Sequence, residues 1–432
     1  MRKIFTVAAF IYCSHLHAQQ DSSSNLDQVV ITATKFPVKQ SNTGKVVTIV
    51  TKEQIEHSSG KDLAQVLNEQ TGIIVSGSNS NPGKDKSVFL RGASSNYTLF
   101  LLDGIPLNDP TGIGGTFDIR LIPLEQIERI EIVKGSQSSL YGSNAIAGVI
   151  NIITRKPEND LLSGNGLLSY GSYNTFKGNV SLNKKGKILE YNLNYQYLSS
   201  DGISEAKDTT GNAHFDKDGF IRQSFQANVG INISDHVKVS PYFRYSQFSG
   251  GYDTDAFTDG SEQFNATMAN AGLISRFKYN SGELIILYGY DHIQSNYSGS
   301  VYSGKFHHAE AYINHHISNS IDLLAGISYE TFQLPKPDTI NRLVSPYASV
   351  VLHYSGLHVE IGGRYNKHNR YGDNTTYSFN PSYLINDRVK LFVDLSSGFR
   401  VPSIGELFGP FGPNPNLKPE NSYTQEGGIQ VW

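Results

Sequence analysis

The sequence predicts a mainly β protein in which a compact α+β domain precedes an antiparallel transmembrane β-barrel. Three observations support this class. The 432 residues include 41 glycines, 25 tyrosines and 22 phenylalanines, a composition typical of strands joined by turns. Apolar and polar residues alternate along extended segments of the C-terminal two thirds of the chain. Short and long connections also alternate there, as they do in membrane β-barrels.

The composition argues against several other classes of protein. Lys+Arg total 36 and Asp+Glu total 39, a net charge of −3, so the chain lacks the basic excess that nucleic-acid binding requires. After the N-terminus no stretch approaches the ~18 apolar residues of a membrane helix. No Ser/His/Asp arrangement or carboxylate pair stands above background, so we expect no enzyme activity.

The N-terminus has the pattern of an export signal. Arg2 and Lys3 precede an apolar run from Ile4 to Tyr12, and the small residue Ala18 follows. This pattern predicts a signal peptide over residues 1–18. The single cysteine, Cys13, lies inside it, so we expect no disulfide in the exported chain.

Residues 19–44 form a second segment, polar at first, that contains one short β-prone run. The run is Asp27, Gln28, Val29, Val30, Ile31, Thr32 and Ala33. It fits either the first strand of the following domain or an exposed strand that pairs with the sheet edge of a partner.

Residues 45–157 predict the compact α+β domain. Thr51 and Gln54 form a capping-box pattern, and 61–70 predicts a short amphipathic helix. Strands are expected at 88–91, 98–102, 129–134 and 148–154. The glycine-rich loops 77–86 and 108–116 lack the strand–loop–helix setting of a phosphate-binding loop, so we expect them to display ligand-binding residues.

Residues 158–432 predict the barrel. In 189–197 the odd positions are Leu or Tyr and the even positions are polar; 225–233 alternates similarly. Soluble sandwich strands are commonly only ~5–6 residues long. Short turns are expected near 183–187, 232–236, 279–282, 317–320, 354–356 and 385–388. Long loops are expected around 199–219, 249–264, 296–306, 334–341, 368–375 and 400–421. This spacing gives about fourteen strands.

A series of motifs in the first domain gives a family resemblance. The motifs are Val88–Gly92, Leu101–Leu107, Ile127–Gly135, Ser139–Gly142 and Ala145–Thr154. In this order they resemble the plug domain of TonB-dependent outer-membrane receptors, and residues 27–33 resemble the TonB box of that family. Phe399–Ser403 with Asn414–Glu420 resembles the family's late-barrel motif.

The resemblance implies a 22-stranded barrel in outer-membrane lipid with the plug folded inside it. It also implies import of a scarce ligand, driven through the TonB protein by the inner-membrane proton gradient, with no required cofactor. The chain stops soon after the late-barrel motif, and Ile429 and Val431 are out of phase with the terminal Trp432. About fourteen strands do not close around a plug, so we expect a C-terminally truncated chain.

Within the family the chain most resembles the vitamin B12 (cobalamin) receptors, whose loop aspartates bind calcium. The resemblance carries this role to Asp216, Asp218 and Asp253, with Asp255 and Asp259 as further candidates. Carboxylates two residues apart supply the oxygen ligands that calcium prefers. One departure is Ser204, which stands beside Glu205 where an acidic residue is expected. The alternative reading is that Asp enrichment reflects turn formation.

Eight residues of the two glycine-rich loops are expected to contact the ligand. They are Ser78, Asn79, Asn81, Lys84, Asn108, Asp109, Thr111 and Thr116. A ferric siderophore or haem is the alternative ligand, and a surface lipoprotein is left open as a further partner. The pairs at 307–308 and 315–316 are interpreted as lumen-facing or interfacial histidines, because adjacent strand residues face opposite sides.

Overall fold

The computed structural model describes residues 28–209, 211, 215–335, 338–386, 388–409 and 412–431. The predicted signal peptide, the first residue of the β-prone run, Asp27, and the terminal Trp432 lie outside these residues. Among the described residues, no helix has both the length and the apolar character needed to cross a bilayer.

The plug domain is built on a five-stranded sheet in the order β3-β8-β9-β6-β7. Its strands are β3 (Val46–Val50), β6 (Thr98–Leu102), β7 (Ile105–Leu107), β8 (Ile127–Lys134) and β9 (Gly148–Thr154). β6 and β9 are parallel, and the other neighbours are antiparallel. Two small sheets accompany it: β1 (Val29–Val30) with β2 (Val38–Lys39), and β4 (Ile73–Ser76) with β5 (Ser87–Leu90). The predicted plug strands are confirmed.

Short helices connect the plug strands. They are α1 (Lys52–His57), α2 (Leu63–Asn68), α3 (Ser138–Tyr141) and the 3-10 turns η1 (Gln40–Asn42), η2 (Ser95–Tyr97), η3 (Ile113–Gly115), η4 (Ile119–Leu121) and η5 (Leu124–Gln126). The predicted capping box of Thr51 and Gln54 is present at α1. The helix expected over 61–70 is shorter because Asp62 caps α2, with Gln65 completing the box.

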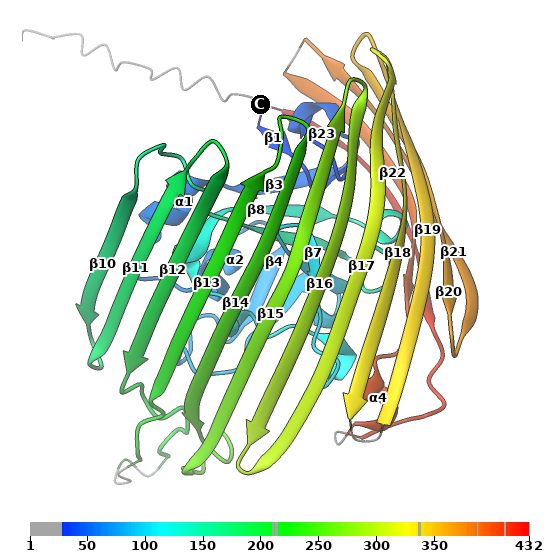
Figure 1. The fold of residues 1–432 in the computed structure, drawn as a ribbon. Coiled ribbons are helices and arrows are strands. Elements are labelled where there is room, and N and C mark those ends of the chain that lie inside the picture. Colours follow the sequence, from blue (N-terminus) through cyan, green and yellow to red (C-terminus); the bar gives the residue numbers. More distant parts are fainter. Residues whose placement is uncertain are drawn as a thin grey trace, which may run out of the picture.

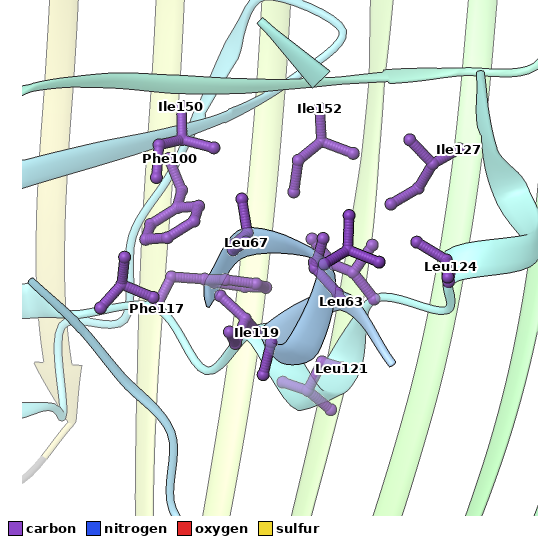
Figure 2. Close-up of a cluster of buried hydrophobic side chains, with 14 of the residues drawn as sticks. Leu63, Leu67, Phe100, Phe117, Ile119, Leu121, Leu124, Ile127, Ile150 and Ile152 are labelled. Atoms are coloured by element: carbon purple, nitrogen blue, oxygen red, sulfur yellow. The ribbon is translucent and has the colours of Figure 1, made fainter. Parts of the chain in front are cut away.

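The plug core lies between α2 and the sheet. Figure 2 shows Leu63 and Leu67 of α2 lying among side chains of the sheet and of the η4–η5 segment, including Ile150 and Ile152. The same cluster continues into the barrel wall through buried residues between Leu198 and Ile293, among them Phe248. Apolar contact therefore attaches the plug to the barrel on this side.

Over the described residues the barrel wall is one antiparallel sheet of fourteen strands in sequence order, which confirms the expected number. The strands are β10 (Ser163–Gly171), β11 (Thr175–Lys185), β12 (Leu189–Ser200), β13 (Phe220–Asn232), β14 (Val237–Tyr252), β15 (Glu262–Tyr279), β16 (Gly282–Tyr297), β17 (Ser300–Ser318), β18 (Ile321–Pro335), β19 (Asp338–Tyr354), β20 (Leu357–His368), β21 (Gly372–Ile385), β22 (Val389–Arg400) and β23 (Glu420–Val431). The short helix α4 (Ile404–Phe408) lies between the last two.

The sheet curves around the plug without closing. Among the described residues β10 and β23 each pair with a single neighbour, β11 and β22. Figure 1 shows the strands side by side around the plug, with the short turns and β1 at the same end of the molecule. Alternation along β12 is as predicted: Gln196 is fully buried, whereas its neighbour Tyr195 is 41% exposed.

Three of the expected long loops are wrong, because the strands continue through them. Residues 296–306 form the ends of β16 and β17, joined at Ser298 and Gly299, which have φ of 45° and 96°. Two successive positive φ values make a tight hairpin turn that matches strand twist. β18 and β19 likewise reach Pro335 and Asp338, and β20 and β21 reach His368 and Gly372. The strands are longer than a bilayer requires, so residues with a loop-like composition lie within strands.

Candidate functional site

The predicted TonB-box segment is docked inside the molecule. β1 pairs with β2, joining Val29 to Lys39 and Val30 to Val38. The side chains of Val30 and Ala33 are completely buried in a cluster with β3 and β8. By contrast, Val29 is 51% exposed. In this conformation the described part of the segment is therefore docked on the plug through β2 and this buried cluster.

One buried carboxylate holds the segment. The Oε2 atom of Glu131 in β8 accepts hydrogen bonds from the backbone N–H of Ile31 and Thr32, both at 2.9 Å, and from the Thr32 hydroxyl at 2.7 Å. Its Oε1 atom accepts two bonds from Arg129. A fully buried carboxylate requires such partners. The hydroxyl of Tyr141 donates to the Thr32 carbonyl at 2.9 Å, and Asn151 donates to the Thr32 hydroxyl.

A lysine just after the segment is anchored to the barrel wall. The Lys35 ammonium forms an ion pair with Glu310 of β17 and lies 4.7 Å from the ring centroid of Tyr347 and 4.9 Å from that of Tyr141. The ammonium is desolvated, so charge pairing and ring faces together replace its water. Release of the segment thus has to break contacts with both the plug and the wall.

The eight plug-loop residues that are expected to contact the ligand differ in their exposure to solvent. Asn79 and Lys84 are exposed, and Thr111 and Thr116 are half-buried. The other four, Ser78, Asn81, Asn108 and Asp109, are buried. The Asp109 carboxylate accepts bonds from the Thr111 backbone at 2.9 Å and hydroxyl at 2.6 Å, and burial raises its pKa to about 6. The Asp109 bonds hold its loop in shape, and contact with ligand stays a prediction for all eight.

Asn81 joins a plug loop to a barrel loop. Its side-chain amide donates to the carbonyl of Asp218 at 2.7 Å and to that of Ile203 at 3.2 Å, and its backbone N–H donates to Glu205 at 2.7 Å. Glu205 also forms an ion pair with Lys84 at 3.5 Å. The glycine-rich loop of the plug and the loop between β12 and β13 therefore form one connected surface.

Three of the five aspartates considered for calcium converge. Asp216, Asp218 and Asp253 each offer a carboxylate oxygen, and these oxygens lie within 4.8 Å of one another. Asp259 accepts bonds from the Asp216 backbone N–H at 3.2 and 3.3 Å and lies beside the group. Asp255 instead accepts from the N–H of Phe257 within its own turn. The structure brings the first three together and leaves Asp255 outside the group.

Burial, backbone donors and charge repulsion set the electrostatics of this aspartate cluster (Asp216, Asp218 and Asp253). Burial, with a further contribution from the Asp253 charge, raises the pKa of Asp218 to about 6. Burial also acts to raise the pKa of Asp253, but the N–H groups of Ala206 and Gly260 outweigh it and hold that pKa below its ordinary value. Ser204, the residue at the departure from the expected pattern, donates to Asp253 at 3.1 Å. The oxygens at the centre fit a hard cation.

Sequence reasoning missed Glu131. It occupies the middle of β8 and is completely buried among Ile130, Ile132 and Val133. A buried carboxylate in a largely apolar strand was a usable signal, because such a group needs a partner. The residues that bond to it lie about a hundred positions earlier in the chain, and a local sequence pattern cannot predict a contact between residues so far apart.

Comparisons with known proteins agree with this architecture. Residues 39–149 match the family model of the TonB-dependent receptor plug domain, and residues 153–432 match the TonB-dependent receptor-like β-barrel. The vitamin B12 transporter BtuB of Photobacterium profundum is 29% identical, with 94% of this chain and 67% of that protein covered. BtuB of Vibrio vulnificus is 27% identical, with 97% and 69% covered.

Solved structures share the fold. The siderophore receptor PirA from Acinetobacter baumannii has a TM-score of 0.74 at 19% identity, covering 89% of this chain and 68% of that one. The ferric yersiniabactin uptake receptor FyuA from Yersinia pestis has a TM-score of 0.70 at 13% identity, covering 91% and 72%. With a family model that spans the whole barrel region, the chain belongs to the TonB-dependent receptors of the outer membrane.

Proposed function

We propose that this receptor imports cobalamin into the periplasm. The observation that carries the proposal is the alignment of nearly the whole chain with two proteins named vitamin B12 transporters. The two solved receptors are less than 25% identical and support only the shared fold. Cobalamin would bind on the surface formed by the exposed parts of the plug loops, among them Asn79 and Lys84, and by the adjoining barrel loops.

We propose further that calcium occupies the aspartate cluster. Carboxylates within 4.8 Å of one another repel, and a divalent cation between them removes that repulsion. The cation would fix the loop after β12 against the loop after β14. Because Asn81 binds the carbonyl of Asp218, the same ordering would reach the plug loop. Calcium would thereby prepare the surface on which the ligand binds.

Transport in this proposal needs the docked segment to leave its site. The outer membrane has no nucleotide supply, so energy comes through a partner. Residues 27–33 would be released towards the periplasm, where TonB would add its own strand to the freed edge by backbone hydrogen bonding. Force from the inner-membrane proton gradient would then rearrange the plug.

Equilibrium binding of cyanocobalamin to the purified receptor in detergent tests the ligand. We expect tight binding in calcium and at least tenfold weaker binding in a calcium chelator. Asp218→Asn should abolish the calcium effect, and Asp255→Asn, a matched change in the neighbouring loop, should retain it. A receptor that binds a ferric siderophore or haem but no cobalamin, with or without calcium, would show that the ligand assignment is wrong.

A further inference from the structure

A histidine hairpin lies at the opposite end of the barrel from the aspartate cluster. β19 and β20 are joined at Ser355 and Gly356, whose φ angles of 44° and 81° are those of a two-residue type I′ turn. Such a turn aligns the flanking residues in register. His353 is therefore placed directly opposite His358. The turn between β19 and β20 is one of the short turns, which lie at the periplasmic end of such barrels.

The two imidazoles converge through the same ring atom. Nδ1 of His353 lies 2.8 Å from Nδ1 of His358. The ring centroids are 5.0 Å apart and the planes are inclined at 70°, so the rings meet edge to face and do not stack. His358 is buried, whereas the His353 side chain is 24% exposed, which leaves the pair accessible from one side.

A carboxylate orients one of the rings. The Oδ2 atom of Asp322 in β18 lies 2.7 Å from Nε2 of His353. A carboxylate only accepts, so Nε2 carries a proton, and Nδ1 is the nitrogen that is left to bind a metal ion. The other oxygen of Asp322 contacts Nδ1 of His316. A carboxylate on the far nitrogen is the arrangement that accompanies metal-binding histidines and raises their basicity.

We propose that His353 and His358 together bind one divalent transition-metal ion, such as Zn²⁺, Cu²⁺ or Ni²⁺, through their Nδ1 atoms. The ion would displace the proton between the two nitrogens, and that proton would leave to Nε2 of His358 or to solvent. Metal–nitrogen bonds of about 2.0–2.1 Å in a tetrahedral site place two ligating nitrogens about 3.3–3.4 Å apart, so the two Nδ1 atoms would separate by about 0.5 Å and both rings would turn until their lone pairs point at the ion. Imidazole suits these metals and not calcium or magnesium. Water would complete the coordination on the exposed side.

The site adjoins a contact between plug and wall. Glu360, two residues beyond His358 on the same face of β20, forms an ion pair with Lys45 of the plug at 2.9 Å. Both side chains of that pair are buried. A bound metal ion would therefore hold the end of the β19–β20 hairpin next to the point where the plug meets the wall, independently of the ligand surface at the other end.

Electron paramagnetic resonance with one equivalent of Cu²⁺ tests the proposal on the exported chain without an affinity tag. We expect a spectrum with two coordinated imidazole nitrogens, and a Zn²⁺ affinity that falls at least tenfold in His353→Gln. His315→Gln is the matched control, because the His315 ring contacts Tyr279 on the neighbouring hairpin, and it should bind as the unaltered protein does.

A second variant keeps the test independent of folding. Asp322→Asn retains both ligating rings, so it should keep the two-nitrogen spectrum while binding Zn²⁺ about 10- to 100-fold more weakly. Unchanged metal affinity in His353→Gln, or a single coordinated nitrogen in the unaltered protein, would overturn the proposal. Cobalamin binding should be the same in all these variants, so failure of the metal site is distinguishable from failure of the proposed function.

Discussion

Replacing Glu131 by alanine should release the docked segment. One oxygen of this carboxylate accepts both backbone N–H groups of Ile31 and Thr32 and the Thr32 hydroxyl. In Glu131→Ala these three donors lose their acceptor inside the plug, whereas in the released state water satisfies them. The substitution therefore disfavours the docked state and leaves the released state unchanged.

The size of the effect follows from the charge on the acceptor. A hydrogen bond to a charged group contributes about 1.5–3 kcal/mol. Three bonds to one oxygen are not additive, so we expect a total of about 3 kcal/mol. At 1.4 kcal/mol per tenfold, the ratio of released to docked segment rises roughly 100-fold. Glu131→Gln keeps one acceptor and should give a smaller change, of roughly tenfold.

A nitroxide spin label at position 29 reports the state of the segment. The chain's only cysteine is Cys13, within the predicted signal peptide, so Val29→Cys gives one labelling site. Val29 is 51% exposed, which leaves room for the label. We expect a broad, immobilised spectrum in the unaltered protein and a narrow, mobile component in Glu131→Ala.

Glu128→Gln is the matched control. Glu128 contacts Arg129 at 3.3 Å on the same strand, and its side chain is 24% exposed, whereas Ile31 and Thr32 bond to Glu131. Its spectrum should equal that of the unaltered protein. If Glu131→Ala stays fully immobilised while its barrel is folded, the carboxylate does not hold the segment.

Three further predictions concern the loops and the plug core. The folded pKa of Asp218, about 6, lies above its ordinary 3.8. The protonated carboxyl group of Asp218 therefore contributes to stability at pH 4, and without calcium this contribution is lost as the pH rises through 6. The midpoint of thermal unfolding, measured against pH, should fall over this range. Asp218→Asn should flatten the dependence. Asn81→Ala breaks two hydrogen bonds, of which the one to Asp218 is buried. Hydrogen exchange in residues 77–86 should therefore accelerate about tenfold, corresponding to about 1–2 kcal/mol. Gly148→Ala should destabilise the plug by about 3 kcal/mol or more, because the new Cβ would lie 2.3 Å from the Val133 carbonyl oxygen. Gly92→Ala, at a positive φ but with no close neighbour, should cost only about 1 kcal/mol. Hydrogen exchange of the plug amides measures both free energies.

Local patterns predicted the elements well. The alternation in 189–197 is a property of adjacent residues, and it gave the correct faces of β12, with Asn194 and Gln196 buried. The Thr51–Gln54 pattern likewise located the start of α1, because a capping box is complete within four residues. Composition was a poorer guide to the loops: residues 296–306 are polar enough for a loop yet form strand ends.

Contacts between distant residues were beyond such patterns. The bond from Asn81 to Asp218 joins residues 137 positions apart, and the contacts of Glu131 join β8 to residues that directly follow β1. The sequence suggested which loops carry binding groups but not that Asn108 and Asp109 are buried within them. The histidine hairpin lies between these cases. A two-residue Ser-Gly turn pairs Tyr354 with Leu357, and the next pair along the strands is then His353 with His358.

Accumulation of labelled cyanocobalamin by cells with this protein as their only cobalamin receptor tests the central claim most directly. The proposed mechanism predicts uptake that stops when the proton gradient is dissipated, and also when residues 28–33 are deleted, while surface binding of the vitamin persists. Continued accumulation by the deletion variant would contradict the claim that the docked segment couples the receptor to its source of energy.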